Sequence, residues 1–201
     1  MRTATGASSI LPQDFYIRDT IHVARSLLGR CLVRVVNRAR MAGRIVEVEA
    51  YRGSHDPASH AFRGLTKRNV PMFAEPGRAY IYFTYGNHYC LNVTTEPEGI
   101  PGAVLIRALE PTQGVEFMRR LRPHVPDLQL TNGPGKLTKA LDIDRTLNTA
   151  DMTKAGPLFI TSADPQNFEI GQSARVGIRQ GRDRKWRFYI VGNPYVSKVN
   201  V

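Results

Sequence analysis

Apolar and polar residues alternate along residues 44–53, which predicts a β-strand with two unlike faces. One face carries small and branched apolar side chains. The other face begins with an isoleucine and then carries two carboxylates and a phenol, which belong to Glu47, Glu49 and Tyr51. A carboxylate on the half-buried face of a strand needs a partner or a chemical role. This strand is therefore the first candidate for a functional centre.

Further strands follow from runs of β-branched, aromatic and aliphatic residues between turn residues. Residues 31–36 are expected to form a hairpin with the opening strand at 43–51, through a polar turn at 37–42. A second hairpin is expected where Gly86 and Asn87 separate two such runs. The complete set of predicted strands covers residues 31–36, 43–51, 78–85, 88–94, 102–109, 158–161, 174–179 and 186–191.

Three segments show the apolar spacing of amphipathic helices. The first, residues 19–29, has a capping residue at its start and a glycine at its end. The second is residues 112–122, and the third is residues 132–141, where a glycine–proline turn precedes lysines. Free backbone amides at the start of the third helix could bind a phosphate. The residues of the second helix that are expected to face the core are Val115, Met118 and Leu121.

Length and composition fit one globular domain, because 201 residues with 42% hydrophobic content can bury one good core and are few for two. Residues 1–10 are expected to form a flexible leader and residues 11–201 the single domain. The leader lacks an apolar signal core, and no run approaches the roughly 20 apolar residues of a membrane span. An intracellular protein without a membrane partner is expected, with Cys31 and Cys90 as reduced thiols.

The charge balance departs from the average. The chain has 28 Lys and Arg against 17 Asp and Glu, which gives a net charge of +11. Such a surface suits phosphates, but its sign alone does not choose between nucleic acid, anionic membrane and acidic ligands.

Residues 52–78 form a long irregular segment, and loops of this length usually bind something. His55, Asp56 and His60 could ligate a metal there, but their spacing matches no standard pattern, and hydrogen bonding or stacking is the preferred interpretation. The tyrosine-rich run at 78–85 could pack in the core. It also carries aromatic residues on both faces, and exposed tyrosines beside a basic surface are typical of proteins that stack on bases.

The two carboxylates at 47 and 49 also have two interpretations. They could be solvated groups on an exposed strand face, or one could remove a proton from a water during hydrolysis, a role worth about 10²–10⁴ in rate. A pair of carboxylates that flanks a sugar ring is disfavoured, because residues two apart on one strand are neighbours. A single general base is the better hypothesis, and the pattern alone does not choose between Glu47 and Glu49.

Several motifs, taken in order, resemble the alkyladenine (methylpurine, 3-methyladenine) DNA glycosylase family. They lie at residues 24–29, 44–51, 68–73, 76–92, 107–111, 133–137 and 192–197, so the resemblance covers nearly the whole chain. With the predicted elements, it indicates a single α+β domain. The expected architecture is a curved, mostly antiparallel sheet with flanking helices and a protruding β-hairpin.

The resemblance implies a role for particular residues. Glu49 matches the general base, and Arg107 matches the arginine that holds the carboxylate and the water. Tyr85, at the hairpin tip, matches the side chain that wedges into the duplex. The base pocket is expected to contain Tyr51, His60, Tyr82 and Asn92. The candidates for contact with the DNA backbone are Arg68, Asn69, Gly135 and Lys136.

The implied activity is base excision repair: a damaged purine is flipped out of double-stranded DNA and its N-glycosidic bond is hydrolysed. Alkylated purines are the expected substrates, and excision of deaminated purines stays open. No pocket lysine matches a Schiff-base nucleophile, so an intact strand with an abasic site is expected from a monomer without metal or cofactor. Two rival functions remain: a basic module that binds damaged DNA without catalysis, and a metal-dependent nuclease that uses His55, Asp56 and His60.

Overall fold

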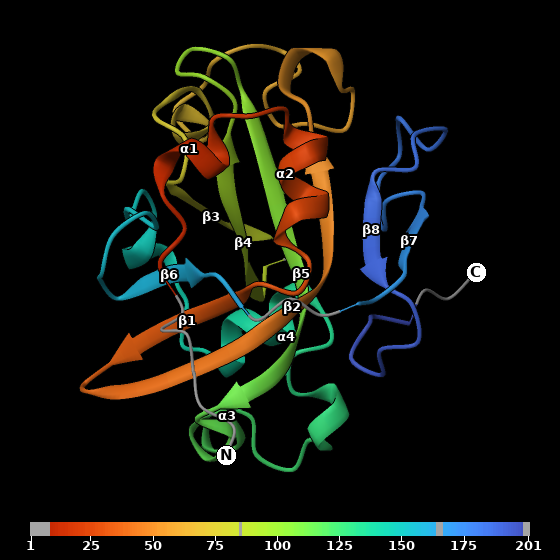
Figure 1. Ribbon diagram of the computed structural model, residues 1–201. Coiled ribbons are helices and arrows are strands. Elements are labelled where there is room, and N and C mark those ends of the chain that lie inside the picture. Colours follow the sequence, from red (N-terminus) through yellow and green to blue (C-terminus); the bar gives the residue numbers. More distant parts are fainter. Residues whose placement is uncertain (1–8, 85, 164–166, 199–201) are drawn as a thin grey trace.

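A computed structural model describes residues 9–84, 86–163 and 167–198 of the chain (Figure 1). The described residues form one α+β unit around an antiparallel sheet, with the path β3-β4-β5-β2-β1-β6 and with β7 and β8 joined to it beside β2. The strands are β1 (Cys31–Val36), β2 (Ala39–Tyr51), β3 (Ala79–Thr84), β4 (His88–Thr95), β5 (Gly102–Gln113), β6 (Leu158–Thr161), β7 (Ile170–Ser173) and β8 (Arg187–Ile190). The expected fold class is confirmed.

Strand β2 is the long curved strand that holds the sheet together (Figure 1). It pairs with β5 along most of its length, with register shifts around Glu47 that mark β-bulges. Its first half also pairs with β1, and its second half pairs with β8, where Glu49 lies opposite Arg187. The two carboxylates therefore lie in the interior of the sheet, where β2 has a strand on both sides, and both are buried.

Short helices surround the sheet: α1 (Gln13–Tyr16), α2 (Thr20–Leu27), α3 (Val115–Leu121) and α4 (Pro134–Ala140). Single 3₁₀ turns lie at Gly53–His55, Val70–Phe73, Asp127–Gln129 and Arg145–Leu147. Helix α2 begins as predicted, because the side chain of Asp19 accepts hydrogen bonds from the backbone of Ile21 and His22. It packs against β2 and β5 through its buried face. None of the described helices is long and apolar enough to cross a membrane.

Three expectations about element boundaries were wrong. Strand β2 begins at Ala39, because the turn consists of Asn37 and Arg38 with φ of 46° and 67°. Strand β5 continues to Gln113, and α3 starts only after Gly114, whose φ is 72°. As a result only Met118 is fully buried on α3, and Leu121 is 37% exposed.

The third error concerns residues 174–179, which are not a strand. The edge strand is β7 instead, and the chain leaves the sheet after Ser173. This irregular segment contributes directly to the candidate site.

Two residues that were expected to lie in the leader, Ser9 and Ile10, contact the strand region around β6. Ser9 exchanges hydrogen bonds with Ser162, and Ile10 bridges Thr161, so both residues belong to the domain. Residues 1–8 lie outside the described part of the chain. The thiols of Cys31 and Cys90 are free, as expected.

Candidate active site

A cavity of about 400 Å³ opens beside the second half of β2. Six of the residues expected in the site come from β2, β3, β4, β5 and the loop after β2, and all six line this cavity: Glu49, Tyr51, His60, Tyr82, Asn92 and Arg107. Residues far apart in the sequence thus meet at one place. Its volume falls in the range of small-ligand pockets.

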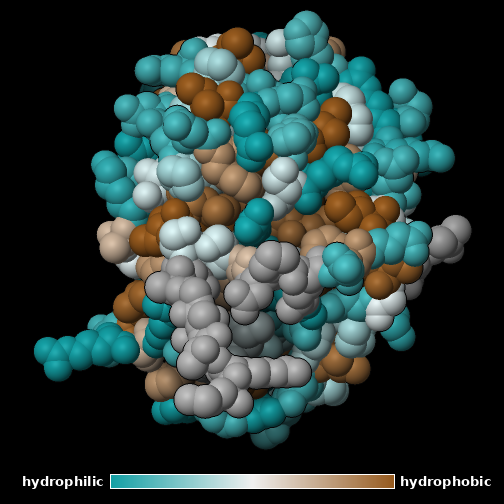
Figure 2. All heavy atoms as spheres, in the orientation of Figure 1, coloured by the Kyte–Doolittle hydropathy of each residue, from teal (hydrophilic) through white to brown (hydrophobic). Residues whose placement is uncertain are grey.

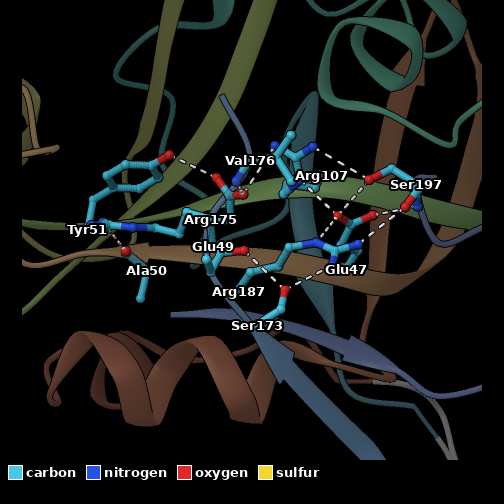
Figure 3. Close-up of polar contacts among 11 residues, drawn as sticks. Glu47, Glu49, Ala50, Tyr51, Arg107, Ser173, Arg175, Val176, Arg187 and Ser197 are labelled. Carbon is cyan, nitrogen blue, oxygen red and sulfur yellow. Dashed lines mark hydrogen bonds and ion pairs between the residues drawn. The ribbon is translucent and has the colours of Figure 1, made fainter. Parts of the chain in front are cut away.

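The Glu49 side chain is completely buried and hydrogen-bonded through both oxygens (Figure 3). Oε2 accepts a hydrogen bond from the hydroxyl of Tyr51 at 2.8 Å, and Oε1 accepts one from the backbone nitrogen of Val176 at 2.7 Å. The guanidinium of Arg107 lies 3.3 Å from Oε1. These contacts fix the direction of the carboxylate at the cavity wall. Burial, followed by the charge of Glu49, raises the pKa of the Tyr51 phenol well above its ordinary value, so the phenol stays a donor.

Glu47 is also buried, but its environment is different. Its carboxylate accepts hydrogen bonds from Arg107 Nε at 2.8 Å, Arg187 Nε at 2.7 Å, and both the backbone nitrogen and the hydroxyl of Ser197 at 2.7 Å (Figure 3). Burial acts to raise the pKa of Glu47, but the two guanidiniums outweigh it and hold the pKa below its ordinary value. Glu47 does not line the cavity. The geometry therefore separates the two carboxylates that the sequence pattern left equivalent.

Aromatic rings from β3 and the preceding loop form another wall of the cavity. The His60 ring meets the Tyr82 ring edge-to-face with centroids 4.6 Å apart, and its Nδ1 lies 2.8 Å from the Tyr80 hydroxyl. The rings of Tyr80 and Tyr82 are 5.3 Å apart. Desolvation of the ring, followed by the nearby charge of Arg68, lowers the pKa of His60 to about 4. The histidine is thus neutral at physiological pH.

Asn92 is a buried residue of β4 and lies opposite Tyr80 on the neighbouring strand β3. Its amide nitrogen donates to the Tyr80 backbone oxygen at 3.0 Å, which fixes the orientation of the side chain at the cavity.

Asp56 forms an ion pair, and the geometry does not support its role as a metal ligand. Its carboxylate is completely buried and receives Arg175 Nη1 at 2.5 Å and Arg175 Nη2 at 2.7 Å. Its oxygens also accept hydrogen bonds from the backbone nitrogens of Arg52 and Ala58. In the described part of the chain, no group of three His, Cys, Asp or Glu residues is arranged to hold a metal ion.

Residues 14–194 match the family model described as methylpurine-DNA glycosylase (MPG). The chain belongs to the methylpurine-DNA glycosylase family. Three relatives carry the provisional name 3-methyladenine DNA glycosylase. The protein of Carboxydothermus hydrogenoformans is 50% identical, over 94% of this chain and 99% of its own length. The proteins of Chlorobium phaeobacteroides and Methanocella arvoryzae are each 48% identical, over 94% of this chain and 97% and 96% of their own lengths.

In this methylpurine-DNA glycosylase, the four candidates for backbone contact lie in different environments. Asn69 is buried, and its amide donates to the backbone oxygens of His60 and Gly64, so its side chain closes the loop. Arg68 is exposed and lies over the Tyr82 ring at 4.9 Å. Gly135 packs against the His88 ring, and Lys136 Nζ donates to Asn132 at 2.8 Å. Tyr85, the expected wedge, lies outside the described residues.

Sequence reasoning missed Arg175, Val176, Arg187 and Ser197, all of which support the glycosylase's carboxylates. The backbone nitrogen of Val176 leaves no trace in residue type. The arginines are two among 28 basic residues, and no spacing relates them to the carboxylates. The motif at 192–197, which contributes to the family resemblance and includes Ser197, was the one available signal, but it gave Ser197 no role.

Proposed function

We propose that this DNA glycosylase hydrolyses the N-glycosidic bond of an alkylated purine that has turned out of duplex DNA into the cavity, with Glu49 as the general base. The observation that carries this proposal is the Glu49 carboxylate: it is buried, it is oriented through both oxygens, and it lines the cavity. Burying and orienting a carboxylate at a cavity is costly, and the cost is explained if the group acts as a general base. A module that only binds DNA would not need such a carboxylate.

In the proposed reaction, Glu49 accepts a proton from a water while the water oxygen attacks C1′ of the sugar. The bond from C1′ to the purine breaks, and its electron pair goes to the base. An alkylated purine already carries a positive charge, so it leaves as a neutral base without a general acid. The negative charge of Glu49 also stabilises the cationic sugar as it forms.

The aromatic wall supports a cationic substrate. Faces of Tyr80 and Tyr82 attract a cation in the cavity by about 0.5–2 kcal/mol. His60 is neutral and adds no repulsive charge. Asn92 is the residue proposed to crowd the exocyclic amino group of normal guanine. Neutral deaminated purines are not attracted to the tyrosine faces as a cation is. Measuring base release from a panel of alkylated and deaminated purines therefore distinguishes the two substrate classes.

Extrusion of the base costs a few kcal/mol and is least costly for weakened pairs. Tyr85, which follows β3 in the sequence and lies outside the described residues, is proposed to fill the space that the base leaves. The candidates for contact with the phosphates are Arg68, Asn69, Gly135 and Lys136.

The product should be an intact strand with an abasic site. None of the described residues that line the cavity is a lysine, so a Schiff-base nucleophile for strand cleavage is missing from that wall. The test is to incubate duplex DNA containing 3-methyladenine with the enzyme in excess chelator and to analyse both base and strand. Free base with an uncut strand is expected. A cut strand would contradict the hydrolytic proposal, and loss of base release in chelator would favour a metal-dependent reaction.

A further inference from the structure

We propose that Arg175 is a positioning residue for the general base, because its ion pair with Asp56 anchors both hydrogen-bond donors of the Glu49 carboxylate. This inference rests on the proposed role of Glu49. Of this pair, the sequence singled out only Asp56, as a possible metal ligand.

The ion pair is the most enclosed one among the described residues. Both side chains have no exposed surface, and two separate guanidinium nitrogens reach the two oxygens of Asp56. Arg184 approaches the same carboxylate only at 4.0 Å and is partly exposed. Paired contacts of this kind fix the plane of a guanidinium, which a single point contact does not.

Arg175 reaches the first donor through the ring of Tyr51. Its guanidinium lies 4.6 Å from the centre of that ring and 5.1 Å from the Trp186 ring. Its Nη1 also donates to the backbone oxygen of Ala50 at 2.9 Å, so it is tied to the strand that carries Tyr51 (Figure 3). The ring is therefore held where its hydroxyl donates to Glu49 Oε2.

Arg175 reaches the second donor through the chain itself. Val176 is the next residue, and its backbone nitrogen donates to Glu49 Oε1. The segment that follows, residues 176–180, lines the cavity but belongs to no strand. Without sheet pairing at this point, the segment is attached to the second half of β2 by the hydrogen bonds that Val176 donates to Glu49 and Arg175 donates to Ala50.

One guanidinium thus determines the position of a donor on each oxygen of Glu49. A displacement of about 1 Å at a reacting group can cost about 100-fold in rate. Loss of the pair should therefore slow base release while DNA binding, which depends on the outer surface, is retained.

The experiment compares Arg175→Lys and the double variant Asp56→Leu/Arg175→Met with the unchanged enzyme. Lysine keeps the charge but cannot pair through two nitrogens, and the double variant leaves no unpaired charge behind. Melting temperature, affinity for duplex DNA with a tetrahydrofuran abasic-site analogue, and the single-turnover rate of base release from 3-methyladenine are measured. We expect the rate to fall about 10- to 100-fold in both variants with affinity retained.

Arg34→Met is the matched control. Arg34 is another buried arginine, but it donates only to backbone oxygens of Val35, Asp142 and Pro157, away from the cavity. Its loss should lower the melting temperature and leave the rate unchanged.

A folded double variant with the rate of the unchanged enzyme would overturn the inference. If the double variant does not fold, Arg175→Lys decides by the same criterion. If neither folds, the inference is also overturned, because the pair would then serve folding alone. Glu49→Gln in the same assay distinguishes failure of the Arg175 inference from failure of the proposed function. An unchanged rate in Glu49→Gln would contradict the proposed function itself, whatever the Arg175 variants do.

Discussion

Glu47 and Glu49 share Arg107, yet each has a different set of other partners. Glu47 is enclosed by two arginines and Ser197, whereas Glu49 has neutral donors and faces the cavity. A carboxylate that is saturated by buried cations is a poor proton acceptor. One that is oriented by a phenol and a peptide nitrogen keeps a free lone pair for water. The proposed division of roles thus follows from the neighbours and not from the residue type.

Removal of the Glu47 charge should destabilise the fold. In Glu47→Gln, Arg187 and Arg107 lose their shared buried counter-charge, and breaking such a pair typically costs about 3–5 kcal/mol. Urea denaturation measures the change in the free energy of unfolding. The control is Glu116→Gln, whose side chain is 74% exposed in its ion pair with Arg119 and whose loss should leave that free energy nearly unchanged. Equal effects of the two substitutions would refute the buried network.

His60 should remain neutral well into the acid range. Its pKa is lowered from 6.5 to about 4, so between these values the unfolded chain binds a proton that the folded protein does not. The contribution of His60 to stability is therefore fully present above pH 6.5 and is lost as the pH falls through 4. An NMR titration of the His60 ring measures the midpoint directly. A midpoint near the ordinary histidine value would show that the ring is solvated and that Arg68 lies elsewhere.

At the residue scale, the sequence was informative where a side chain itself is proposed to take part in the chemistry. Glu49, Tyr51 and Arg107 could be proposed from alternation and motif. The hydrogen bond that the Val176 backbone donates to Glu49 could not be predicted, because any residue type can supply a backbone donor and its position depends on tertiary contacts alone.

At the scale of elements, the segment that connects β2 to the loop is fixed by a glycine. Gly53 has a φ of 50°, and a Cβ added there would lie 2.1 Å from the backbone oxygen of Pro101. This packing sets the course of the chain between Tyr51 and Asp56, and thereby the position of the cavity wall.

Gly53→Ala should therefore be severely destabilising. A left-handed φ costs a non-glycine residue about 1–2 kcal/mol, and the clash with Pro101 adds to this. Gly99→Ala is the control, because Gly99 has a φ of 85° but open space around its Cα, so only the conformational cost applies. Thermal denaturation of both variants gives the comparison. If Gly53→Ala is no less stable than Gly99→Ala, the close approach to Pro101 is wrong.

Element prediction succeeded where local pattern and tertiary structure agree. Helix α2 has its cap and its apolar face in the sequence, and the hairpins have their turn residues. Residues 174–179 show the opposite case. Their alternation is that of a strand, but Arg175 is directed to a buried carboxylate from another loop, and this ion pair overrides the local preference.

At the scale of the whole molecule, the fold brings a basic surface and a buried acidic centre together. The net charge is +11, and the view in Figure 2 is covered largely by hydrophilic residues with smaller apolar areas between them. The positive exterior attracts the DNA backbone, with an affinity that falls as salt rises. In the proposed reaction, one buried carboxylate lies beside the position where the sugar becomes cationic. Sequence could predict the sign of the surface but not that β2, β5 and β8 enclose both acidic residues.

The central claim is that Glu49 activates water, and the single-turnover rate of Glu49→Gln tests it most directly. The amide keeps the shape of the side chain but cannot accept the proton, so base release from 3-methyladenine duplex should fall by about 10²–10⁴. Affinity for the lesion duplex should be retained, because phosphate contacts dominate binding. Base release at the rate of the unchanged enzyme would contradict the account.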